Sequence, residues 1–132
     1  MADLNEQAAL AAEILGSLAL EGRHTIATAE SLTGGAVSAA ITSVAGASQW
    51  FERGFVVYTA RAKSEMLDVP PELIEKEGVV SLAVAHAMAR GAAARSTADL
   101  SVALTVPPAA RPRRLSAPFA SAGGRNSLTV RS

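Results

Sequence analysis

Ser31 is the residue of this chain whose type and position most readily suggest chemistry. It lies in the stretch 25–35, which begins as a β-branched strand, turns at Glu30, and continues through Gly34 and Gly35 into an alanine-rich helix. Such a turn leaves free backbone N–H groups at the helix start and a hydroxyl at the carboxyl end of the strand. Open α/β sheets bind their ligands there. The pattern indicates either a functional site or simple helix capping, and by itself it does not separate the two.

Polar residues also follow the other two predicted strands. Tyr58 and Thr59 come where the second strand ends, and Thr105 comes directly after the third. If the strands are parallel neighbours, their carboxyl ends open onto one edge of the sheet, so these residues would gather around Ser31. Lys63, one helical turn beyond Thr59, could reach the same place.

A serine is a poor nucleophile unless a base lies beside it. Neither histidine is well placed and cysteine is absent, which leaves lysine as the available base. Lys63 could serve if burial or neighbouring positive charge favours its neutral form. Ser48 could relay a proton between hydroxyl and amine, and the N–H groups of residues 33–35 could receive an oxyanion or a phosphate. A solvated lysine and a capping serine remain the alternative.

The order of predicted elements indicates a layered α/β/α domain with a mostly parallel sheet. Helical spacing of apolar residues follows Asp3 as far as Gly22, and a loop or short helical turn is expected over 47–51. The remaining helices are expected at 36–42, 60–67, 72–77 and 81–95, and the strands at 25–29, 55–58 and 99–104.

The composition of the chain excludes several classes of protein. Its 132 residues fit one domain, and 49% of them are hydrophobic. Without cysteine there can be no disulfide or thiolate metal site, and two histidines make a histidine-rich metal site unexpected. No apolar stretch approaches membrane-spanning length, so we expect a soluble cytoplasmic protein that does not contact a membrane.

The net charge of zero hides an asymmetry along the chain. Residues 1–105 carry seven basic and all twelve acidic residues, whereas residues 106–132 carry five arginines and no acid. The second segment is rich in Pro, Ala, Ser and Gly and shows no regular period, which predicts a disordered basic tail, with 128–130 as a weak strand fragment. Because its arginines lack interleaved aromatic residues, nucleic-acid binding is not expected.

Several motifs at consistent spacing resemble the CinA C-terminal family, the nicotinamide-nucleotide amidases. Ala29-Glu30-Ser31-Leu32-Thr33-Gly34-Gly35 is similar to the A-E-S-x-T-G-G signature of that family, and the segment ending at Lys63 is similar to V-x-Y-[ST]-x-x-A-K. The likeness includes residues 46–54, 67–70 and 78–81, and it covers roughly residues 5–105.

The resemblance implies hydrolysis of the carboxamide of nicotinamide mononucleotide, giving nicotinate mononucleotide and ammonia without a metal or organic cofactor. By matching position, Ser31 resembles the nucleophile, Lys63 its base, Ser48 a bridging hydroxyl and Tyr58 a positioning or proton-handling residue. Residues expected to line the nucleotide pocket are Glu30, Thr33, Gly34, Gly35 and Thr105. The expected partner is this small nucleotide, and homodimer formation is left open.

The likeness stops after Thr105. There the family continues into a glycine-rich G-I-A-G-P-x-G-G loop and a K-P-V-G-T-V strand, whereas this chain reads Val-Pro-Pro-Ala-Ala-Arg-Pro-Arg-Arg. We therefore expect a partial domain over 1–105, a non-matching tail over 106–132, and a frameshift or truncation that removes the last third of the family's domain. Weak or absent amidase activity follows from that expectation. The alternatives are a non-catalytic nucleotide-binding module, an interaction protein working through its tail, and a hydrolase of another amide.

Overall fold

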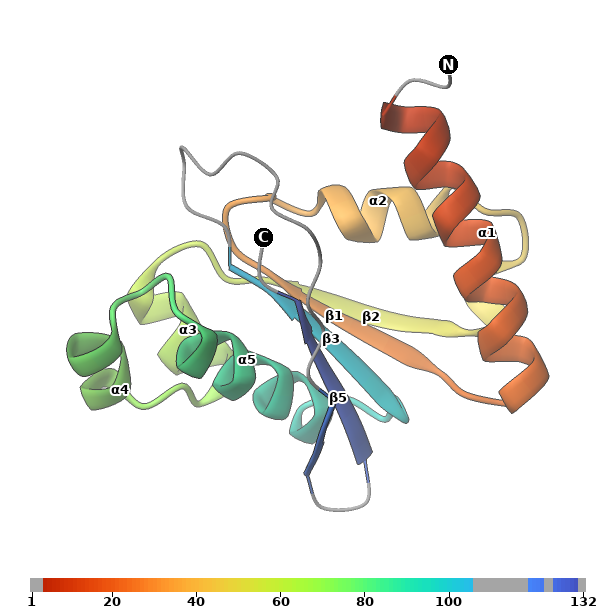
Figure 1. Ribbon diagram of the computed structural model, residues 1–132. Helices are drawn as coiled ribbons and strands as arrows, with labels where there is room; N and C mark the ends of the chain where they lie inside the picture. The colour runs from red at the N-terminus through yellow and green to blue at the C-terminus, as the bar shows by residue number, and fades with distance from the viewer. Residues whose placement is uncertain (1–3, 106–118, 123–124, 131–132) are drawn as a thin grey trace.

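A computed structural model describes residues 4–105, 119–122 and 125–130. The chain forms both helices and strands (Figure 1). The amino-terminal half comprises α1 (Leu4–Gly22), β1 (Ile26–Glu30), α2 (Ala36–Thr42), the short 3₁₀ turn η1 (Ala47–Gln49) and β2 (Phe51–Val56). The remainder comprises α3 (Ala60–Leu67), α4 (Pro71–Glu77), α5 (Leu82–Ala94), β3 (Leu100–Leu104), β4 (Phe119–Ala122) and β5 (Arg125–Val130).

The strands form one sheet in the order β2-β1-β3-β5-β4. β1 is parallel to both of its neighbours, and Glu30 at its end stands opposite Val56 of β2 and Leu104 of β3. β5 is parallel to β3, and β4 is antiparallel to β5. The carboxyl ends of β1, β2 and β3 therefore meet at one edge, as the sequence predicts.

Helices cover both faces of the sheet, so the fold is the predicted α/β/α arrangement (Figure 1). Alternate side chains of a strand point to opposite faces, and β1 follows this rule. Ile26 packs in a cluster with residues of α1 and α2, whereas Ala29 packs in a cluster with α3 and α5. The second cluster is built from small aliphatic side chains because α5 is rich in alanine, which brings the helix close to the sheet.

Local signals fix where the helices around the sheet edge begin. The Thr59 hydroxyl accepts a hydrogen bond from the amide of Ala62 and caps α3, and the Ser81 hydroxyl caps α5 through the amide of Val84. Pro71 opens α4, where its missing N–H costs nothing. The cap of α1 predicted at Asp3 lies outside the described residues.

The second strand is displaced from its predicted position. β2 spans Phe51–Val56 instead of 55–58, and Trp50 immediately before it is buried among residues of α1 and α2. The apolar run at 55–58 suggested a fully covered strand, but β2 is an edge strand of the sheet, so polar residues are tolerated along it. Tyr58 consequently lies in the turn that leads to α3.

Two stretches of the range expected to be a disordered tail are strands. β4 and β5 extend the sheet beyond β3, and β5 contains the fragment 128–130 noted in the sequence. The expectation of disorder is wrong at these positions, because a partly polar segment can pair through its backbone without a regular side-chain period. Residues 106–118, 123–124 and 131–132 lie outside the described part. None of the described helices is long and apolar enough to cross a membrane.

Candidate active site

The structure brings Ser31, Lys63 and Thr105 to the carboxyl edge of the central strands. The amide of Ser31 donates to the carbonyl of Leu104 at 3.3 Å, which ties the serine to the end of β3. Lys63 lies in the first turns of α3, the helix that follows β2. Thr105 is the residue directly after β3. Parallel pairing in register therefore creates the cluster that the sequence order suggested.

The ammonium or amine group of Lys63 is enclosed by oxygen atoms. Its Nζ lies 2.9 Å from Ser31 Oγ, 3.0 Å from the carbonyl oxygen of Val57 and 3.2 Å from that of Tyr58. The residue is 0% exposed, and none of the acidic residues in the described part forms an ion pair with it. Burial lowers the pKa of Lys63 below its ordinary value of 10.5, because the charged form is desolvated without a compensating carboxylate.

The three oxygen atoms can accept the three N–H bonds of the ammonium form, and the same positions also suit a neutral amine that serves as a base. A neutral amine has two N–H bonds and one lone pair, and the carbonyls of Val57 and Tyr58 can accept the two N–H bonds. In the structure Nζ donates to Ser31 Oγ as well. Once the lysine has lost one proton, its lone pair can instead accept the hydroxyl proton of Ser31. The segment directly after β2 thus orients the lysine toward the serine, a contribution that the sequence analysis did not anticipate.

Ser31 is held in a tight turn between β1 and α2. Its carbonyl accepts a hydrogen bond from the amide of Gly34 at 3.0 Å. Gly34 and Gly35 have φ angles of +61° and +103°, which other residues adopt only with strain. The two glycines are therefore needed to turn the chain from strand to helix with the Ser31 hydroxyl facing Lys63.

Glu30 points away from the serine and into the start of α2. Its carboxylate accepts four hydrogen bonds, from Thr33 Oγ1, the amide of Val37, and the amide and hydroxyl of Ser38, at 2.7 to 3.0 Å. Burial by itself raises the pKa of Glu30, but these hydrogen bonds outweigh it and lower the pKa below 4.5. Because both oxygens are already engaged, the structure corrects the expectation that Glu30 lines the substrate pocket.

Thr105 carries the one unpartnered buried side-chain polar atom among the described residues. It is 1% exposed, and its Oγ1 has no hydrogen-bond partner. A buried hydroxyl without a partner is costly, so such groups commonly meet a ligand or ordered water. Thr33, by contrast, uses its hydroxyl on Glu30, and the amide of Gly34 is used on Ser31.

The structure does not bring Ser48 into the cluster, which corrects its expected role as a bridging hydroxyl. Ser48 lies in η1 before β2, and the amide of Ile26 at the start of β1 donates to the carbonyl of Trp50. This is the amino edge of the sheet, separated from Ser31 by the length of β1, about 16 Å at roughly 3.3 Å per residue. A hydroxyl there cannot pass a proton between Ser31 and Lys63.

Tyr58 contributes to the cluster through its backbone. Its carbonyl accepts a hydrogen bond from Lys63, while its side chain is 61% exposed. Sequence reasoning also overlooked Ser38, whose amide and hydroxyl bind Glu30. An acidic residue shortly before a predicted helix could have signalled this contact, since carboxylates favour helix starts.

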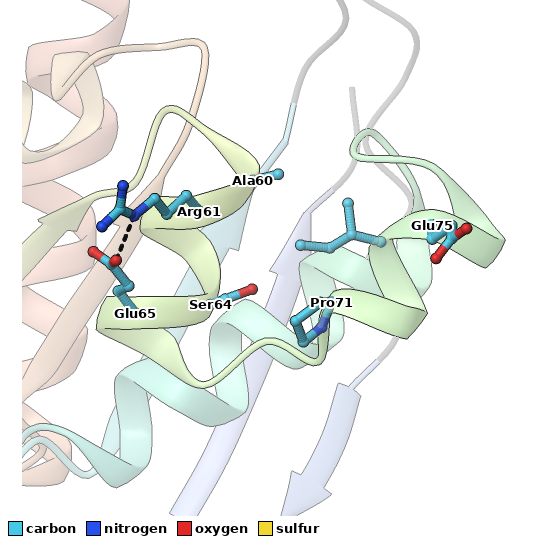
Figure 2. Close-up of a pocket in the computed structure, with 7 residues that line it drawn as sticks. Ala60, Arg61, Ser64, Glu65, Pro71 and Glu75 are labelled. Carbon is cyan, nitrogen blue, oxygen red and sulfur yellow. Dashed lines mark hydrogen bonds and ion pairs between the residues drawn. The ribbon is translucent and has the colours of Figure 1, made fainter.

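Cavities also open elsewhere in the described part of the molecule. One, of about 350 Å³, lies between α3 and α4, and its lining includes Arg61 and Glu65, which form an ion pair along α3 (Figure 2). Another is apolar, also of about 350 Å³, and lies between α1 and α2. Neither is lined by Ser31 or Lys63. The described residues contain no group of three or more acidic or histidine side chains that could hold a metal ion.

Comparison with known proteins gives one consistent family. The family model described as the CinA C-terminal domain matches residues 7–107. A CinA-like protein of Geotalea daltonii is 48% identical over 81 residues, and one of Akkermansia muciniphila is 53% identical over 79 residues. These matches cover 61% and 60% of this chain but only 20% and 19% of the relatives. The chain thus spans about a fifth of the length of these curated relatives.

Solved structures show the same similarity. The competence/damage inducible protein CihA from Agrobacterium tumefaciens is 40% identical with a TM-score of 0.65, and the match covers 78% of this chain and 60% of that one. A CinA superfamily protein from Escherichia coli is 32% identical with a TM-score of 0.73, covering 78% and 59%. The match to the family model ends two residues beyond Thr105, close to where the sequence departs from the family pattern.

Proposed function

Because this chain belongs to the CinA C-terminal domain family, we propose that it is a serine–lysine amidohydrolase that acts on nicotinamide mononucleotide. The products are nicotinate mononucleotide and ammonia. The observation that carries the proposal is the 2.9 Å contact between Ser31 Oγ and the fully buried Nζ of Lys63. The choice of substrate rests on the family resemblance of the motifs around these two residues.

The reaction proceeds through an ester of Ser31. Lys63 accepts the hydroxyl proton while Ser31 Oγ forms a bond to the carboxamide carbon. The tetrahedral intermediate collapses, the C–N bond breaks, and Lys63 gives the proton to the departing ammonia. A water molecule then attacks the ester carbon, its proton passing to Lys63 and on to Ser31 Oγ as the carboxylic acid leaves.

The activity of this chain is expected to be weak. Beyond Thr105 the sequence lacks the glycine-rich loop that the family places next to the site, so one wall of the nucleotide pocket differs. Thr105 itself is buried with an unpartnered hydroxyl, a position suited to contact with the substrate. If the altered wall abolishes catalysis entirely, we expect the chain still to bind the nucleotide without hydrolysing it.

Ammonia release from nicotinamide mononucleotide tests the proposal. We expect slow release by the purified full chain, with none above background for Ser31→Ala or Lys63→Met, since each substitution removes one half of the reacting pair. Circular dichroism of each variant establishes that it is folded. Release that persists in Ser31→Ala would overturn the assignment of the nucleophile, and nucleotide binding without release would support the non-catalytic alternative.

A further inference from the structure

We propose that Glu30 is the positioning residue for Ser31, fixing the strand-to-helix turn so that the serine hydroxyl faces Lys63. The inference rests on the proposed role of Ser31 as nucleophile and adds a residue that never touches the substrate. Glu30 precedes Ser31 directly in the chain and is 0% exposed. Its side chain links the end of β1 to the turn at Thr33 and to the start of α2.

Glu30 holds the chain on both sides of Ser31, through its main-chain carbonyl on the strand side and through its carboxylate on the helix side. On the strand side, the carbonyl of Glu30 accepts a hydrogen bond from the amide of Val57 at 2.8 Å, which locks the end of β1 to the end of β2. On the helix side, Oε1 accepts from Thr33 Oγ1 at 2.7 Å and from the amide of Val37 at 2.8 Å. The backbone of Ser31 therefore lies between two segments that are fastened to the same residue.

A chain of hydroxyl groups anchors the second carboxylate oxygen to the sheet. Ser38 Oγ donates to Glu30 Oε2 at 2.7 Å, so the hydroxyl of Thr28, 2.7 Å from Ser38 Oγ, must be the donor in their contact. A Cβ added at Gly54 of β2 would lie 2.6 Å from Ser38 Oγ and 2.7 Å from Thr28 Oγ1. Only glycine at this position of β2 leaves room for the network, which links β1 to α2.

The network needs an acceptor at both oxygens of residue 30. All four groups that contact the carboxylate are donors, and none of the described lysines or arginines forms an ion pair with it. Glutamine has the same shape but replaces one oxygen by an NH₂ group. In either orientation that group would face one backbone N–H, of Val37 or of Ser38, which can only donate, while the neighbouring hydroxyl can turn to accept. The turn must then shift to relieve this conflict, and Ser31 shifts with it.

Covalent labelling of Ser31 by a fluorophosphonate measures this positioning without an amide substrate. In that reaction Ser31 Oγ bonds to phosphorus, fluoride leaves, and Lys63 takes the hydroxyl proton. We expect Glu30→Gln to label about 100-fold more slowly than the unmodified chain, because a misplacement of about 1 Å at a reacting group has an effect of that order. Thr33→Val, which removes one of the two bonds to Oε1, is expected to label about 10-fold more slowly, because a smaller displacement of Ser31 has a smaller effect of the same kind.

The pH profile separates positioning from proton transfer. The midpoint of the labelling rate against pH is set by Lys63, so it should stay in place in Glu30→Gln while the plateau falls. Ser101→Ala is the matched control, because it removes another fully buried hydrogen bond, from Ser101 Oγ to the carbonyl of Ala89. It should lower stability and leave the labelling rate unchanged.

Several outcomes would overturn the inference. The first is that folded Glu30→Gln is labelled as fast as the unmodified chain, and the second is that Ser101→Ala is slowed as much as Glu30→Gln. The third is a shifted pH midpoint in Glu30→Gln, and the fourth is that the unmodified chain is not labelled at all. If Glu30→Gln does not fold, the rate of Thr33→Val decides, and an unchanged rate there rejects the proposal. Labelling with the expected pattern but without ammonia release would reject the amidase substrate and still support the role of Glu30.

Discussion

At the scale of single residues, the site depends on two buried ionisable groups, Glu30 and Lys63, whose surroundings act in opposite ways on the charged form. Glu30 is surrounded by donors that hold its carboxylate ionised, whereas Lys63 faces only neutral oxygens that leave its ammonium form desolvated. The pKa of each group is lowered. One residue is thereby kept charged to hold structure, and the other is shifted toward the neutral form that a base requires.

The shifted pKa of Lys63 predicts how stability depends on pH. The unfolded chain binds the lysine proton up to about pH 10.5, while the folded chain loses it at a lower pH. Between those two values the unfolded state binds more protons, so the free energy of unfolding rises with pH. We expect this rise in urea denaturation to be absent in Lys63→Met, and Lys76→Met at an exposed position to retain it. Identical pH slopes for the unmodified chain and Lys63→Met would contradict the prediction.

At the scale of elements, α5 packs closely against α3, the helix that carries Lys63. The closest approach is at Gly91, where an added Cβ would collide with the carbonyl oxygen of Leu67 and lie 2.8 Å from its Cβ. Leu67 ends α3, the helix that carries Lys63, and both it and Gly91 are buried. Gly91 therefore sets the distance between the two helices on that face.

Gly91→Ala is expected to destabilise the protein although alanine favours helices. The added methyl forces α5 away from α3 and should lower the free energy of unfolding by about 2 kcal/mol, in the range for overpacked cores. The exposed Arg90→Ala in the same helix is the control and should change stability by less than about 0.5 kcal/mol. Denaturant midpoints of the three proteins check the prediction, and a stabilised Gly91→Ala would show that the contact with Leu67 is easily relieved.

At the scale of the whole molecule, the sheet continues past the region that matches the family. β5 pairs with β3 from Leu100↔Asn126 to Leu104↔Val130 and is covered by α5. This pairing protects an edge of β3 that would otherwise be exposed. Stability of the domain should therefore depend on a segment that has no counterpart in the family's motifs.

Ser127→Pro tests whether β5 contributes to stability. Ser127 pairs with Ser101 of β3 on one side and with Ala120 of β4 on the other, so proline removes a backbone donor from the interior of the sheet. A loss of about 1–3 kcal/mol in the free energy of unfolding is expected. Ser127→Thr, which keeps the donor and favours strands, should be neutral. A neutral Ser127→Pro would indicate a tail that does not stabilise the domain, as the sequence alone predicted.

The sequence by itself determined the α/β/α class and the order of the elements over 1–105. It also indicated Ser31 and Lys63 as the candidate nucleophile and base. These features follow from short-range patterns, namely the spacing of apolar residues, helix-capping residues, the glycines of a turn and the family motifs. Only the tertiary structure decided which groups meet. The register of β1 against β2 and β3 places Ser31 beside Lys63 and leaves Ser48 at the opposite edge. The hydrogen bonds of Glu30 turn it into α2, because partners seven and eight residues away satisfy its carboxylate there. Contacts of this kind depend on how strands align and helices cross, which no local stretch of sequence specifies.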